Sequence, residues 1–185
     1  RALEVGHKHN LTDYQAIKAV NSLRNVCDID AFHSLYISLR SAALVEDEDA
    51  INDLGWLWLN GRWLPADHCL ARRLFRLAAT LGSAEALFNL AAQSYYGKGT
   101  SIDVNLAIDY YELAYEQGIT CAALELGLLY ESGDDGLPAD SRLAAEWFLQ
   151  GAGEGDLQAC FNLGLLSLEQ PSTSADEAIG LYWLQ

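Results

Sequence analysis

The second half of this 185-residue chain has almost no basic residues. Residues 100–185 contain 15 acidic residues and one basic residue, Arg142, whereas residues 1–99 contain 11 acidic and 10 basic residues. Residues 100–185 therefore carry −14 of the net charge of −15. Such a surface repels phosphate backbones and anionic lipids, which argues against nucleic-acid and membrane binding. A basic protein partner is its natural complement; a solubilising surface without a dedicated partner is the equal alternative.

Long apolar runs and catalytic signatures are also missing. No run of 18 apolar residues occurs, so no segment is expected to span a membrane. The sequence has no HExxH or GxSxG motif and no phosphate-binding glycine loop. Cys27 and His33 are separated by a helix break, and Asp134, Asp135 and Asp140 lack the spacing of a calcium loop. We therefore predict a protein that is not an enzyme, with no catalytic residues, metal site or cofactor.

The cysteines show no pairing pattern. Cys27, Cys69, Cys121 and Cys160 form no CxxC motif and no pair that recurs from repeat to repeat. Thiols that are mostly buried and outside disulfides are expected, which slightly favours a reducing cytosol. The chain opens at Arg1, so a leader peptide would not be visible, and a periplasmic or secreted location stays open. The chain also stops within an expected helix, which favours a fragment.

What the chain does contain is an internal repeat of 36 residues. Stepping 36 residues back from one set of landmarks reaches a matching set without a gap: Leu90, Gly97, Asp103, Ala107, Tyr111, Ala114 and Gly118 match Leu54, Gly61, Asp67, Ala71, Phe75, Ala78 and Gly82. A forward step reaches Leu126, a one-residue insertion near Asp134–Pro138 restores the later landmarks, and a fourth copy starts at Leu163–Gly164. This period, with two helical patterns per copy, predicts an all-α solenoid of antiparallel helix pairs.

Small residues recur at fixed places in the repeat. An alanine lies four residues before each landmark leucine, at Ala50, Ala86, Ala122 and Ala159, and a glycine or alanine follows each leucine, at Gly55, Ala91, Gly127 and Gly164. Small side chains at such places let two helices approach closely, while leucines and aromatic residues fill the space between them. Gly82, Gly118 and Gly155 are expected to end the second helices in the left-handed conformation.

The helical pattern sets the expected elements. We predict first helices at about 47–60, 83–96, 119–132 and 156–169, and second helices at about 67–81, 105–117, 141–151 and from Asp176. Residues 11–45 form a degenerate repeat, with one helix from Leu11, a break at Asp28–Asp30 and another helix through Phe32 to Ala43. The acidic run Glu46–Asp49 suits a helix N-terminus.

The third copy resembles the Sel-one-like repeat, a relative of the tetratricopeptide repeat. The matching residues are Ala122, Leu126, Gly127, Tyr130, Gly133, Ala144, Trp147, Phe148 and Gly155. The resemblance covers residues 46–185 and implies a right-handed α/α superhelical solenoid, with repeats at 46–82, 83–118, 119–155 and an incomplete copy at 156–185. Residues 1–45 are then a linker and the degenerate pair. Ala91, Trp63 and the shortened loop at Pro171–Ser174 depart from the pattern.

The resemblance implies a protein-binding scaffold or adaptor, because the family's members are mostly adaptors. In tetratricopeptide relatives the first helices line a concave groove, and transfer of the groove positions predicts these protein-binding residues: Asn52, Trp56, Leu59, Glu85, Phe88, Tyr95, Tyr96, Leu128, Glu131 and Phe161. For Leu128 among them, inter-repeat core is an equal alternative. None of the first helices contains Lys or Arg, so a clamp for an acidic tail is absent. The expected partner is a basic or amphipathic helix or loop.

Two other functions stay open at this point. Some bacterial members of the family act as immunity proteins, and an acidic surface would suit a basic toxin. A few secreted members are credited with roles as cell-wall-associated hydrolases or binding modules. Arg72, Arg73 and Arg76 lie on a second helix, where we expect them to pair with neighbouring carboxylates rather than to bind an anionic partner.

Overall fold

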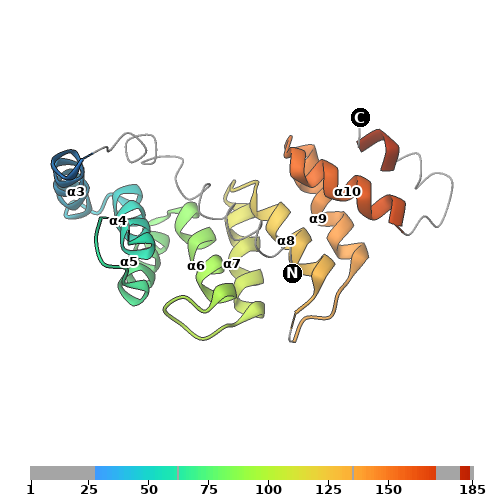
Figure 1. Cartoon of the computed structure of the whole chain (residues 1–185), viewed down its shortest axis with the longest axis horizontal. Helices are drawn as coiled ribbons and strands as arrows, with labels where there is room; N and C mark the ends of the chain where they lie inside the picture. Colours follow the sequence, from blue (N-terminus) through green and yellow to red (C-terminus); the bar gives the residue numbers. More distant parts are fainter. Residues whose placement is uncertain (1–27, 62, 135, 170–179, 184–185) are drawn as a thin grey trace. The chain divides into compact units, whose positions relative to one another are not determined.

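A computed structural model describes residues 28–61, 63–134, 136–169 and 180–183 (Figure 1). Its helices are α3 (Ile29–Ala43), α4 (Glu48–Asn60), α5 (His68–Leu81), α6 (Ala84–Tyr96), α7 (Val104–Glu116), α8 (Ala122–Ser132), α9 (Ser141–Gly153) and α10 (Leu157–Glu169). Within these residues, the extended pairing consists of one bridge between Asp134 and Leu137. The predicted all-α class is confirmed. The chain divides into two compact units, Arg1–Asp103 (unit 1) and Val104–Gln185 (unit 2).

Short polar side chains fix where the helices begin. Asp47, Asp67 and Ser83 each precede a first helical residue and accept a hydrogen bond from the backbone N–H three positions on, at 2.8, 2.8 and 3.2 Å. These bonds satisfy N–H groups that have no partner within the helix. Glu48 and Asp49 follow in the first turn of α4, so the predicted role of the acidic run at a helix start is confirmed.

Glycines end three of the helical segments as predicted. Gly82, Gly118 and Gly155 have φ values of 113°, 97° and 86°. Residues with a side chain rarely adopt this conformation, whereas glycine adopts it at little cost. At Gly82 the chain reverses through hydrogen bonds to the carbonyls of Ala78 and Ala79, which starts the next repeat.

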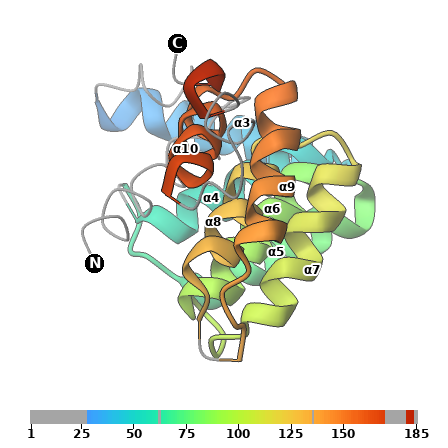
Figure 2. The ribbon, with the colours of Figure 1, turned by 90° about the vertical axis from the view of Figure 1, so that its right-hand side faces the viewer.

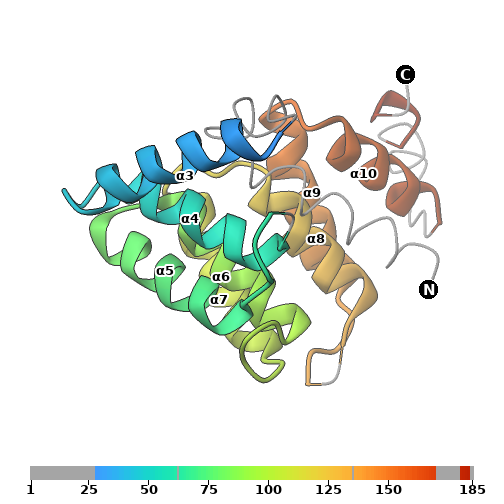
Figure 3. The same ribbon diagram turned by 60° about the vertical axis from the view of Figure 1, so that its left-hand side comes forward.

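Unit 1 is built by helices that pack in chain order, with α3 against α4, α4 against α5 and α5 against α6 (Figure 3). Phe32, Leu54 and Leu57 form a core between α3 and α4. Phe75 of α5 is fully buried and faces Gly55 of α4, where an added Cβ would lie 2.7 Å from the ring. The predicted reason for the small residue after the landmark leucine is therefore confirmed.

Unit 2 repeats this construction with α7 against α8, α8 against α9, and α10 against both α9 and α8 (Figure 2). Phe148 takes the position of Phe75 and packs against Gly127. The inserted residue lies in a tight turn where Asp134 and Leu137 exchange backbone hydrogen bonds of 2.8 and 2.9 Å. A local turn thus absorbs the insertion, and the core register is kept.

Several predictions fall on other parts of the chain or need correction. The helix from Leu11, the start at Asp176, Cys27 and the shortened loop lie outside the described residues. Across the described ranges, no helix is both long enough and apolar enough to cross a membrane. The described cysteines form no disulfide. The prediction of mostly buried thiols is wrong for the described cysteines, because Cys69 is exposed and Cys121 and Cys160 are only half-buried.

Candidate protein-binding surface

The structure buries three of the predicted binding residues of unit 1. Asn52, Leu59 and Phe88 expose at most 6% of their surface, and Phe88 exposes 1%. The side-chain oxygen of Asn52 accepts a hydrogen bond of 2.8 Å from the side-chain amide of Asn89, which links α4 to α6. Such side chains offer almost no surface to a partner, and they support the fold instead.

The other predicted residues of unit 1 are half-buried. Trp56 packs against the core between α3 and α4, and its indole N–H is buried without an acceptor in the described part of the chain. Tyr95 and Tyr96 contact each other edge to face, with ring centroids 4.7 Å apart. Glu85 lies beside the cap of α6, with 3.5 Å between its carboxylate and the Ser83 hydroxyl. The structure thus pairs the two tyrosines and attaches Trp56 to the core.

Buried polar residues of the first helices were not recognised in the sequence. Asp53, Asn89 and Glu125 each precede a landmark leucine by one residue, and all three are buried. A buried polar group costs free energy unless it is hydrogen-bonded, so these positions hold internal polar contacts. The sequence does show a polar residue directly before the landmark leucine in every copy, with Asn162 in the fourth. This recurrence could have identified the positions.

A different arrangement appears on α10 in unit 2. The residue two positions before the landmark leucine is at most 9% exposed in α4, α6 and α8, whereas Phe161 at this position in α10 is 47% exposed. Leu157 and Leu165 lie one turn to either side and are 83% and 39% exposed. The four-residue spacing places the three side chains along one helix face. We call Leu157, Phe161 and Leu165 the α10 stripe.

The remaining two predicted residues are on α8, which packs beside α10. Leu128 is half-buried and packs against the core of unit 2, which includes Phe148 and Leu163. Glu131 is half-buried one turn further along α8. The structure therefore places Leu128, Glu131 and Phe161 on neighbouring helices of one unit, and only Phe161 presents a large exposed apolar side chain.

The α10 stripe belongs to a unit with a strongly acidic sequence. That sequence holds 14 acidic residues and one basic residue, Arg142, whose guanidinium lies 2.8 Å from the Glu146 carboxylate on α9. Burial, and then the charges of Asp109 and Glu116, raise the pKa of the Glu112 carboxyl. Within α10, Glu169 is the one charged residue. The unit thus combines an uncharged apolar stripe with an acidic sequence, and its single basic residue already forms an ion pair.

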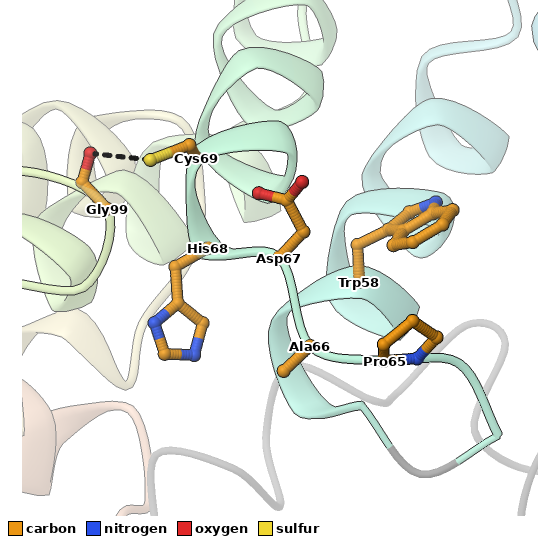
Figure 4. Close-up of a pocket in the computed structure, with 7 residues that line it drawn as sticks. All are labelled: Trp58, Pro65, Ala66, Asp67, His68, Cys69 and Gly99. Carbon is orange, nitrogen blue, oxygen red and sulfur yellow. Dashed lines mark hydrogen bonds between the residues drawn. The ribbon is translucent and has the colours of Figure 1, made fainter.

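Unit 1 contains an open depression of about 460 Å³ at the start of α5 (Figure 4). It is lined by Trp58, Pro65, Ala66, Asp67, His68, Cys69 and Gly99. The Asp67 carboxylate caps α5, and the Cys69 thiol lies 3.9 Å from the Gly99 carbonyl. Figure 4 shows the His68 ring pointing away from both side chains, so no nucleophile is paired with a base. In the described ranges, no group of three or more His, Cys, Asp or Glu residues could hold a metal ion.

The arginines of α5 do not form the expected ion pairs. Arg72 donates to the Ser94 hydroxyl from both terminal nitrogens at 3.3 Å. Arg73 and Arg76 are exposed, and no ion pair involves either of them in the part of the chain that the structure describes. The prediction of pairing is wrong for these residues, because their side chains project into solvent.

The model of the Sel1 repeat matches residues 48–83, 84–119, 122–156 and 157–185. The chain belongs to the Sel1 repeat family. Proteins built from Sel1 repeats generally act as protein-interaction scaffolds and are typically non-catalytic.

Two curated relatives are similar to part of this chain. The chain is 28% identical over 166 residues to chitin synthase regulatory factor 4 of Schizosaccharomyces pombe, covering 88% of the chain and 24% of that protein. It is 30% identical over 118 residues to an uncharacterized protein of Neisseria meningitidis serogroup B, covering 64% of the chain and 24% of that protein. The chain thus spans about a quarter of the length of each relative.

Solved structures show the same fold. A protective antigen present in uropathogenic Escherichia coli strains, which displays a Sel1-like repeat fold, matches with a TM-score of 0.73 at 24% identity over 98% of this chain and 39% of that chain. A Sel1 repeat protein from Oxalobacter formigenes matches with a TM-score of 0.68 at 24% identity, over 80% of this chain and 43% of that chain. The predicted α/α solenoid class of this chain is confirmed.

Proposed function

We propose that this chain is a non-enzymatic scaffold that binds a partner protein through the α8 and α10 side of unit 2. The partner segment is an amphipathic helix or loop with basic residues. The observation that carries the proposal is the α10 stripe, which exposes apolar side chains in a unit whose single basic residue is already paired. Apolar contact supplies affinity, and the acidic surroundings select the sign of the partner's charge.

Phe161 is the expected anchor. Full burial of a leucine or phenylalanine side chain stabilises a contact by about 1.5–3 kcal/mol. Since Phe161 is half exposed, its burial by a partner is worth about 1 kcal/mol, and Leu157 adds more because it is 83% exposed. Aromatic residues at the centre of an interface often contribute most of the binding free energy. The carboxylates of unit 2 attract a basic segment over roughly a Debye length, about 10 Å at 0.1 M salt.

The test is affinity capture by the immobilised chain, with mass-spectrometric identification of the bound proteins. Phe161→Asp places a charge in the stripe, and Leu149→Asp is the matched control on α9, since Leu149 is 52% exposed in the same unit. The proposal predicts capture of a basic protein that Phe161→Asp abolishes and Leu149→Asp leaves unchanged, with both variants keeping the wild-type circular dichroism spectrum. Equal capture by all three proteins would overturn it.

The acidic field also supports a narrower alternative, neutralisation of one basic toxin by this chain as an immunity protein. In that case a single basic protein would bind with one-to-one stoichiometry, and the complex would weaken steeply with salt. A scaffold predicts capture that depends more on Phe161 than on salt. Capture repeated at about 0.1 and 1 M salt separates the two functions, because screening shortens the reach of charges to about 3 Å at 1 M.

A further inference from the structure

The second helices of two successive repeats carry opposite charges at equivalent positions. Arg73 and Arg76 of α5 lie 36 residues before Asp109 and Glu112 of α7. The leucines that follow, Leu77 and Leu113, are equivalent as well. Helix α5 has three arginines and no acidic residue, whereas α7 has three acidic residues and no basic one. The two faces therefore match in position and oppose each other in sign.

Both faces are available at the surface. Arg73, Arg76 and Leu77 of α5 are exposed, as are Asp109, Leu113 and Glu116 of α7, while Glu112 is half-buried. Among the described residues, no ion pair involves any of these arginines or carboxylates. Like charges three or four positions apart on a helix repel one another, so each face by itself is unfavourable. A surface of the opposite sign would relieve this repulsion on both helices.

We propose that the exposed face of α5 in one copy of the chain docks on the exposed face of α7 in a second copy. Leu77 and Leu113 form the apolar centre of this contact, and the arginines of one copy meet the carboxylates of the other. The match between two different helices can form twice in a two-fold pair, or continue head to tail. A second copy is favoured as the occupant because each chain carries both complementary faces at the same repeat offset.

The association is expected to be weak. A contact between two helix faces is much smaller than the roughly 800 Å² per partner of a standard protein interface. The net charge of −15 also repels a second copy as a whole. A dissociation constant on the order of 0.1–1 mM is consistent with a few exposed charge pairs and one leucine contact.

The test is sedimentation equilibrium of the chain over a concentration series that reaches the millimolar range. The wild-type chain is expected to show an average mass that rises with concentration. Arg73→Glu/Arg76→Glu and Asp109→Arg/Glu112→Arg should each weaken self-association about tenfold or more, because attraction becomes repulsion. An equimolar mixture of the two variants should associate again, since each supplies the face that the other lost.

Arg40→Glu/Lys98→Glu is the matched control, because it makes the same change of net charge as the α5 variant without touching α5 or α7. This control and Phe161→Asp should leave self-association as in the wild type. A wild-type chain that stays monomeric throughout overturns the proposal, and so does a variant mixture no more associated than its components. Binding of an acidic protein to α5 without any self-association would also overturn it, and would leave the function proposed for α10 untouched.

Discussion

Units 1 and 2 share one repeat pattern, but α10 of unit 2 exposes a residue at a position that the other first helices, α4, α6 and α8, bury. In unit 1 the position of Phe88 is buried and a side-chain hydrogen bond joins Asn52 to Asn89, whereas in unit 2 the equivalent Phe161 is half exposed. Both residues are phenylalanine, so the residue type alone does not distinguish a core position from a candidate binding position. What differs is the exposed fraction of the side chain, which is 1% for Phe88 and 47% for Phe161. The shared repeat pattern determines where the helices lie. The burial of each side chain then determines which residues a partner can contact.

The largest effect is expected at the phenylalanines that fill equivalent core positions in the two units. Phe75→Ala in unit 1 and Phe148→Ala in unit 2 should each lower the free energy of unfolding by about 3–5 kcal/mol, because each removes a fully buried ring and leaves a cavity. Leu149→Ala, on the exposed side of α9, should cost less than about 0.5 kcal/mol. Urea denaturation measures all three. Unequal losses for the two phenylalanines would show that the units do not share one core design.

The second prediction contrasts Phe88 and Phe161, which occupy the same repeat position. Phe88→Ala should cost about 3–5 kcal/mol of stability, since its side chain is 1% exposed. Phe161→Ala should cost about 1 kcal/mol or less, since half of its surface is already in water, and should instead weaken partner capture. Thermal unfolding and capture assays on the same samples report both properties. A large loss of stability for Phe161→Ala would assign that residue to the core.

A third comparison concerns buried and exposed amide pairs. Asn52→Ala leaves the buried amide of Asn89 without its 2.8 Å partner and should cost about 1–3 kcal/mol. Asn162 of α10 accepts a hydrogen bond of 3.0 Å from Gln158 at the surface, so Asn162→Ala should cost less than about 0.5 kcal/mol. Chemical denaturation of both variants provides the measurement. Equal costs would contradict the structural role assigned to the Asn52–Asn89 contact.

The smallest effect concerns Glu112 and pH. Burial, with the charges of Asp109 and Glu116, raises the pKa of Glu112 above its ordinary value of 4.5. A raised pKa in the folded state means that the protonated form stabilises the fold, and this stabilisation is lost as pH rises through the folded pKa. Glu112→Gln should therefore increase stability at neutral pH by about 0.2–0.5 kcal/mol for each like-charge pair removed.

The gain for Glu112→Gln should disappear below pH 4.5, where the wild-type carboxyl is protonated in both states. Melting temperatures of the variant and wild type at pH 7 and pH 4 provide this comparison. Arg142→Gln serves as the contrasting change, because it removes the exposed ion pair with Glu146 and should lower stability slightly at pH 7. A gain for Glu112→Gln that is the same at both pH values would contradict the electrostatic explanation.

Much of the fold could be predicted from local chemistry. The bounds of α6 and α10 agree within one residue with the predicted 83–96 and 156–169, because alanine spacing and a capping residue define each helix within its own segment. Gly55 and Gly127 were recognisable as close-approach positions for the same reason. These features depend on contacts that recur in every copy, so one chain displays them several times.

Exposure could not be predicted in the same way. Groove positions were transferred from tetratricopeptide relatives, but Asn52, Leu59 and Phe88 are buried, because the rotation of each helix against its neighbours decides which face is covered. Arg73 and Arg76 were expected in ion pairs, although an acidic residue nearby in sequence does not place a carboxylate within reach. Such properties depend on distances between helices, which the repeat pattern alone does not contain.

The most direct test of the proposed binding surface is site-specific photo-crosslinking from position 161, with position 149 on α9 as the control. Both sites are exposed in unit 2, but only the first lies in the α10 stripe. We predict that a crosslinking residue at 161 captures a basic protein and that one at 149 does not. Crosslinking of the same partner from 149 but not from 161 would contradict the assignment of the α10 stripe as the binding surface.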